Sequence, residues 1–265
     1  MYVRPTAPLS IGGVIDDAIR VYSASFSRCW IPALLVAVLA GILAIYFSIN
    51  IFSGISRTDP RAMLHAYSRP GVYGLYLVQW VVSAGLYGAI FLAQDSATGG
   101  SERSLGDAFG TGFARLGWAL IAGICFGVAI MLGFVLLIVP GIWVMGALCL
   151  WPVALYIDGA GPLESLGVSH TLTRGNWWRT SVILTVAFVI IVVLMTVIGI
   201  VAGMLTAFLR RDFALAIMGV QSVTMVANVF VLPMYTAILL SIYRDLKLRR
   251  EGGDLAARLE AVPAG

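Results

Sequence analysis

The stretch from Gly161 to Arg179, GPLESLGVSHTLTRGNWWR, organises this chain of 265 residues. It opens with Gly-Pro, and proline is favoured at the first position of a helix because its missing N–H has no helical partner there. Gly175 supplies the stop, since glycine readily adopts the left-handed conformation that follows a last helical turn. The sequence then continues with Trp177, Trp178 and an arginine, residue types that lie at the depth of lipid headgroups. The stretch therefore predicts a short interfacial helix over 162–174, directly before a long apolar run.

The same arrangement occurs twice earlier in the chain, over 10–27 and over 104–116. Each copy has an acidic residue, then an arginine and a tryptophan, and each precedes a hydrophobic segment. Such an internal repeat predicts three equivalent interfacial helices. The alternative is that amphipathic helices at a membrane surface resemble one another in any protein.

Local patterns support the two earlier copies. From Ile11 to Phe26, apolar residues recur at three- and four-residue steps while Asp16 and Asp17 face away, which is typical of a helix that lies in the interface. In the second copy, Ser104 and Asp107 have the spacing of a capping box.

The composition excludes a soluble globular protein. Hydrophobic residues make up 60% of the chain and charged residues only 11%, whereas soluble domains carry roughly 25% charged residues. The fold class predicted is therefore all-α, a polytopic integral membrane protein. The net charge of +4 is too small and too dispersed for a nucleic-acid surface, and it fits contact with anionic phospholipid headgroups.

Six apolar segments are candidates for membrane spans, for which about 20 residues are needed. The fourth has only 16 residues and contains Pro152, so it either spans together with a flanking turn or forms half of a re-entrant hairpin. Pro140 and Gly141 are expected to separate it from the third. The predicted spans are 31–55, 72–93, 118–139, 142–157, 181–209 and 214–243, and they are followed by a short tail over 251–265.

Basic residues set the orientation. With six spans, twelve arginines and lysines fall on the side that holds both termini and five on the other side. Both termini are therefore expected to be cytoplasmic.

Residues that could perform catalysis are scarce. No charged residue lies deep inside a predicted span, and the two histidines have no acidic partner at a useful spacing. No nucleophile–base pair, metal cluster or phosphate-binding glycine loop is visible. The sequence thus predicts a protein that is not an enzyme and needs neither a metal nor another cofactor.

Two sets of residues are candidate binding sites. The first consists of interfacial residues that could bind a lipid headgroup or simply fix the protein's orientation: Arg20, Arg28, Arg115, Arg174, Arg179, Trp177 and Trp178. The second consists of polar residues within spans, which either line a pocket or hydrogen-bond between helices: Gln79, Gln221 and Asn228.

Three stretches together resemble a known family. They are PLSIGGVIDDAIRVY (Pro8–Tyr22), VPGI (Val139–Ile142) and the Gly161–Arg179 stretch. They are similar to the membrane domain of glycerophosphoryl diester phosphodiesterases and to related small bacterial inner-membrane proteins. The resemblance implies a bacterial inner (cytoplasmic) membrane. Catalysis in that family belongs to a separate soluble barrel with acidic and histidine residues, so the resemblance implies the membrane module alone and no catalytic residue.

The function expected from these observations is a non-enzymatic membrane module. It would bind lipid headgroups or support a partner protein at the cytoplasmic face, and the small-xxx-small motifs in the spans leave a homodimer open. The alternative expectation is a transporter or channel for a small amphiphilic solute.

Overall fold

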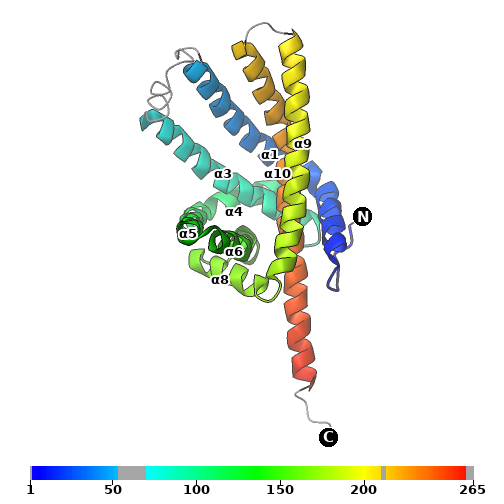
Figure 1. Cartoon of the computed structure of the whole chain (residues 1–265). Helices are drawn as coiled ribbons and strands as arrows, with labels where there is room; N and C mark the ends of the chain where they lie inside the picture. The colour runs from blue at the N-terminus through cyan, green and yellow to red at the C-terminus, as the bar shows by residue number, and fades with distance from the viewer. Residues whose placement is uncertain (1, 53–69, 210–212, 261–265) are drawn as a thin grey trace.

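The computed structural model describes residues 2–52, 70–209 and 213–260 (Figure 1). Within them the chain is helical and no strand occurs. The polar loop expected after the first span, the turn expected after the fifth and the end of the tail lie outside the described residues. The helices are α1 (Ile11–Phe52), α3 (Pro70–Ala97), α4 (Leu105–Ala114), α5 (Leu116–Leu136), α6 (Ile138–Leu148), α7 (Trp151–Val153), the π-helix η1 (Ala154–Asp158), α8 (Pro162–Thr173), α9 (Trp177–Leu209) and α10 (Phe213–Glu260).

Six helical stretches of the described chain are long and apolar enough to cross a membrane, which confirms the polytopic all-α class. The fourth combines α6, α7 and η1 and is longer than the segment predicted over 142–157. The six stretches are Ile11–Tyr46, Gly71–Ala97, Leu116–Leu136, Ile138–Asp158, Trp177–Thr206 and Met218–Gly252.

The structure corrects the prediction for the beginning of the chain. The interfacial helix expected over 10–27 and the span expected over 31–55 form one continuous helix, α1, which packs along α10. Its buried face carries Val14, Ala18 and Val21, and Asp17 is buried as well instead of facing away. Asp17 lies inside because the Tyr2 hydroxyl donates a hydrogen bond to its carboxylate at 2.9 Å.

The other two short helices form as separate elements. At the start of α4, the Ser104 hydroxyl accepts from the Asp107 backbone N–H and the Ser104 N–H donates to the Asp107 carboxylate, which confirms the capping box. These hydrogen bonds lower the pKa of the Asp107 carboxyl. At the end of α8, Gly175 adopts a left-handed φ of 83°, as predicted for the stop.

Helices α5 and α6 form a hairpin whose break differs from the prediction. The chain leaves the helix at Leu137, which is extended, and not at Pro140-Gly141. Pro140 instead lies in the first turn of α6, where a proline removes no intrahelical bond. Gly133 and Gly141 let the two helices approach closely, since a Cβ on Gly133 would lie 2.8 Å from the Gly141 Cα. In Figure 1 this hairpin is seen nearly end-on, while α9 and α10 stand upright, so it crosses the long helices steeply.

Helices α9 and α10 are longer than the spans predicted over 181–209 and 214–243. Helix α9 already begins at Trp177, so the Trp-Trp-Arg anchor forms its first turn. Helix α10 continues through the basic residues and most of the predicted tail to Glu260, and it accommodates Pro233. It contacts α1, α3 and α9 and is the central helix of the bundle.

Packing of α4 on α3 depends on Gly112, which gives a first testable prediction. A Cβ at Gly112 would lie 2.5 Å from the Gly85 carbonyl oxygen, whereas one at Gly110 on the same helix would meet no atom within 4 Å. We expect Gly112→Ala to destabilise the protein by about 1–3 kcal/mol through overpacking. Thermal unfolding in detergent micelles measures the effect.

Gly110→Ala is the matched control for this substitution. It adds the same methyl group to the same helix without a clash, and alanine favours the helix over glycine. Its unfolding temperature should equal or exceed that of the native chain. Equal unfolding temperatures for the two variants would contradict the close α3–α4 contact.

Candidate functional site

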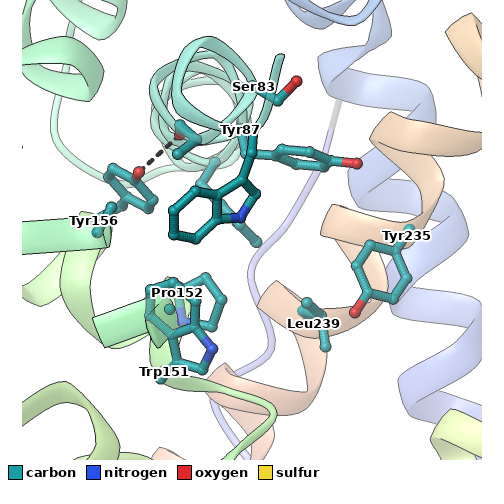
Figure 2. Close-up of a pocket in the computed structure, with 12 residues that line it drawn as sticks. Ser83, Tyr87, Trp151, Pro152, Tyr156, Tyr235 and Leu239 are labelled. Atoms are coloured by element: carbon teal, nitrogen blue, oxygen red, sulfur yellow. Dashed lines mark hydrogen bonds between the residues drawn. The ribbon is translucent and has the colours of Figure 1, made fainter. Parts of the chain in front are cut away.

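A central chamber of about 200 Å³ lies where α3, α5, α7, η1 and α10 meet (Figure 2). Its walls are largely aromatic, and Figure 2 shows the side chains of Tyr87, Trp151, Tyr156 and Tyr235 around it. The lining residues are Trp80, Ser83, Ala84, Tyr87, Phe91, Ala119, Gly123, Trp151, Pro152, Tyr156, Tyr235 and Leu239.

A second chamber of about 590 Å³ adjoins the first, between α5, α6 and α9. The two chambers share Trp151, Pro152 and Tyr235 as walls. Apart from these, apolar side chains such as Phe126, Ile130, Leu184 and Phe188 dominate the lining. Phe188 is 66% exposed, so this chamber opens at its rim toward the surroundings of the helices.

A third chamber of about 480 Å³ lies on the other side of the first, between α1, α3 and α10. It shares Trp80, Ser83 and Tyr87 with the central chamber. Gln79 and Asn228 both line it, so two of the three predicted intramembrane polar residues meet at one cavity. The three chambers adjoin one another through shared wall residues, and we refer to them together as the aromatic cavity.

Tyr156 is held rigidly in the wall of the aromatic cavity. The π-helix η1 carries it toward α3, where its hydroxyl donates to the Ala84 carbonyl at 2.7 Å. Its ring stacks on Phe91 with centroids 6.4 Å apart, and it lies directly over Gly88, where any Cβ would collide with the ring. π-helical turns are frequently found at functional sites.

Three other hydroxyl groups of the central chamber make no hydrogen bond within the part of the chain that the structure describes. They belong to Ser83, Tyr87 and Tyr235. Hydroxyls can donate or accept, and such a cavity with a few polar groups among aromatic walls is the usual form of a small-molecule site.

The third intramembrane polar residue lies apart. Gln221 is on α10 about two turns before Asn228 and lines none of the three chambers. Asn228 itself uses its amide nitrogen to donate to the Thr224 carbonyl at 3.0 Å.

The predicted headgroup residues do not form one site. Arg20 is exposed on α1, and Arg174 is exposed directly after the end of α8. Arg28 donates to the Ser96 hydroxyl at 3.1 Å, and Arg115 donates to the Leu155 carbonyl beside Gly159. Three of the seven, Arg20, Arg28 and Arg174, are therefore exposed, and Arg115 makes its contact within the protein.

The tryptophan pair and the last arginine are also divided. Trp177 donates through its indole N–H to the Trp143 carbonyl at 3.0 Å, while Trp178 packs edge-on against it and is 78% exposed. Arg179 turns inward to form an ion pair with Asp245 at 3.1 Å. Of this group, Trp178 alone presents most of its surface to a lipid.

Arg179 and Asp245 belong to a clamp that sequence reasoning missed. The Leu9 backbone N–H donates to Asp245 at 2.7 Å, and the Leu9 carbonyl accepts from Arg179 at 2.6 Å and from Arg249. Arg249 also pairs with Asp245 at 3.0 Å. The clamp joins the N-terminal segment to the start of α9 and to α10, and its sequence signal was an aspartate within the basic run after the last span.

Two further ion pairs fix the same end of the bundle. Arg244 is buried and pairs with Asp95 at the end of α3 at 2.7 Å. Asp158 at the end of η1 accepts from Tyr243 and pairs with Lys247 at 3.0 Å. The two carboxylates lie near the ends of α3 and η1, whereas Arg244 and Lys247 lie within α10. Arg244 bonds through Nη2, and its buried Nε and Nη1 have no partner among the described residues.

The N-terminal segment packs against the core through Tyr2 and Leu9, while most of its other residues are exposed. Burial, together with the Asp17 carboxylate, raises the pKa of Tyr2 to about 12.

No group of three or more His, Cys, Asp or Glu side chains that could hold a metal ion occurs in the described part of the chain.

These features define an all-α, multi-pass membrane protein with an internal aromatic cavity. Residues 72–246 match the family described as a domain of unknown function (DUF7847), about two thirds of the chain, and the protein belongs to that family. No curated protein and no solved structure matches the chain. The match begins in α3 and so includes every helix that walls the aromatic cavity except α1. The likeness to the phosphodiesterase membrane domain stays a prediction.

The clamp gives a second testable prediction. Asp245→Ala leaves Arg179 and Arg249 without their carboxylate and the Leu9 N–H without its acceptor. We expect the variant to lose about 2 kcal/mol of unfolding free energy. This value lies between those for exposed and for fully buried ion pairs, because Arg179 and Arg249 are partly exposed. Chemical unfolding in micelles measures it.

Asp16→Ala serves as the control, since Asp16 is an exposed aspartate at the same end of α1. That variant should unfold like the native chain. If the Asp245→Ala and Asp16→Ala variants gave the same unfolding curve, the clamp would not stabilise the protein.

Proposed function

We propose that this chain is a non-enzymatic membrane module that binds a lipid-like amphiphile between its spans. The observation that carries the proposal is the aromatic cavity, whose chambers of about 200, 590 and 480 Å³ adjoin one another among helices apolar enough to cross a membrane. Ligand sites commonly measure roughly 300–1,000 Å³ and are mostly apolar with a few polar groups.

Lateral entry from the bilayer supports this function. The second chamber has exposed side chains at its rim, with Phe188 at 66%, Met145 at 45% and Ile142 at 44%. In a membrane, such a rim is in contact with lipid tails. An apolar chain can therefore pass from the bilayer into the chamber without crossing water.

The role of the interfacial arginines follows from where they lie. Arg115 and Arg179 make their contacts inside the protein, which leaves the exposed Arg20, Arg28, Arg174 and Trp178 for contact with anionic headgroups. These contacts would anchor the module beside its ligand. We further propose a bacterial inner membrane with both termini cytoplasmic and a relation to the phosphodiesterase membrane domain, on the sequence patterns described above.

A transporter for a small amphiphilic solute is the second candidate. It is favoured by Gln79 on α3 and Asn228 on α10, which face the same chamber from two helices. This function requires solute flux into proteoliposomes that Gln79→Leu or Asn228→Leu abolishes, and binding without flux would leave the first proposal standing alone.

Native mass spectrometry after gentle extraction tests the binding function. We expect an amphiphile of defined mass on the native protein, and Thr185→Trp should reduce its occupancy at least about tenfold because the indole fills the rim of the second chamber. Val193→Trp is the control, since Val193 lies on the same helix, is 56% exposed and lines no chamber.

Two results would contradict the proposal. The first is a protein that carries no amphiphile under any gentle extraction. The second is equal occupancy in the Thr185→Trp and Val193→Trp variants. A co-purifying polypeptide in place of a lipid would instead favour support of a partner membrane protein.

A further inference from the structure

We infer that the amphiphile carries an uncharged flat ring with carbonyl oxygens and an apolar tail, the chemistry of a prenylated quinone. The inference rests on the proposed binding function and adds the class of ligand. It assigns the ring to the central chamber and the tail to the second chamber.

The absence of charge on the cavity walls determines the first property. No Asp, Glu, Lys, Arg or His is among the described residues that line the three chambers. Charged residues close in sequence to the cavity lining make their contacts elsewhere, Arg115 with the Leu155 carbonyl and Asp158 with Tyr243 and Lys247. A charged group placed deep among the spans would lack a counter-ion and pay a high desolvation cost. The part of the ligand inside the cavity is therefore uncharged.

The shape of the central chamber determines the second property. A dry cavity of about 150 Å³ is known to hold a benzene ring, so the central chamber of about 200 Å³ has room for a substituted ring. Its walls include the ring of Trp80. They also include the rings of Tyr87, Trp151 and Tyr156, which Figure 2 shows. Aromatic faces favour another flat ring in an offset or edge-on arrangement.

The free hydroxyls determine the third property. Ser83 and Tyr87 on α3 and Tyr235 on α10 line the central chamber, and in Figure 2 the Ser83 hydroxyl points away from Trp151 and Tyr156. None of these three hydroxyls has a hydrogen-bond partner in the described protein. The fourth hydroxyl of the chamber, that of Tyr156, already donates to the Ala84 carbonyl. Ligand carbonyl oxygens would accept hydrogen bonds from these donors, and donors on two helices suit a ring with more than one carbonyl.

The second chamber provides the place for the tail. It shares Trp151, Pro152 and Tyr235 as walls with the central chamber and extends between α5, α6 and α9 to its exposed rim. Its lining is dominated by branched and aromatic apolar side chains, as an isoprenoid chain requires. A ring in the first chamber can thus keep its tail in apolar surroundings as far as the bilayer.

Menaquinone-4 is the probe for the test. The purified full chain is placed in phosphatidylcholine nanodiscs and titrated with menaquinone-4, and bound quinone is counted by native mass spectrometry. Saturable binding of one quinone per chain is expected, with no competition from added phosphatidylglycerol. The double variant Tyr87→Phe and Tyr235→Phe should weaken binding about tenfold, since each lost hydrogen bond is worth roughly threefold to tenfold.

Tyr73→Phe is the matched control, because Tyr73 lies on α3, is 61% exposed and lines no chamber. It should bind menaquinone-4 like the native chain. Equal affinity of the double variant and the control would overturn the assignment of the ring to the central chamber.

The outcomes separate this inference from the function on which it rests. If menaquinone-4 does not bind but a charged phospholipid is retained and lost in Thr185→Trp, the quinone inference fails and the binding function stands. If neither quinone nor lipid is retained, both fail.

Discussion

The Arg179–Asp245 ion pair is the interaction on which the arrangement of the helices depends. It lies where the N-terminal segment, the first turn of α9 and the polar part of α10 meet. Two further ion pairs connect α10 to α3, through Arg244 and Asp95, and to η1, through Lys247 and Asp158. The bundle is thus fastened by charge at one end. Toward the other end, α1, α3, α9 and α10 diverge in Figure 1, and the aromatic cavity lies among these helices and the α5–α6 hairpin.

Close packing and open space are produced by opposite kinds of residue. Glycines such as Gly88, Gly112 and Gly133 allow helices and rings to approach to contact distance. Wide rings at Trp80 and Trp151 cannot fill a helix junction completely, and the interruption of α6 before Trp151 prevents a regular helix from closing it. The cavity therefore follows from local irregularity within a well-packed bundle.

The sequence was sufficient for the features that depend on local pattern. Apolar length identified the six spans, and the capping box at Ser104 and the left-handed Gly175 were predicted because both are decided within a few residues. Gln79 and Asn228 stood out because amides are uncommon in apolar runs, but the sequence left open whether they line a pocket or hydrogen-bond between helices; both line the third chamber.

Contacts between residues that are far apart in the chain could not be predicted from the sequence. Asp17 was assigned to a solvent face because nothing near it in the chain indicates Tyr2 as its partner on the inside. Arg179 was assigned to a lipid headgroup because its carboxylate stands 66 positions later in the chain, within a run that reads as basic. The merging of two predicted helices into α1 likewise reflects packing along α10 and not a local signal.

The clamp on Leu9 has a consequence for the biogenesis of the protein. Leu9 and Asp245 are separated by 236 positions, so all the residues between them must be synthesised before the Leu9 N–H finds its acceptor. Until then α1 can pack on α3 but has no α10 against which to bury Ala18. The clamp therefore closes late, after the intervening helices have entered the bilayer.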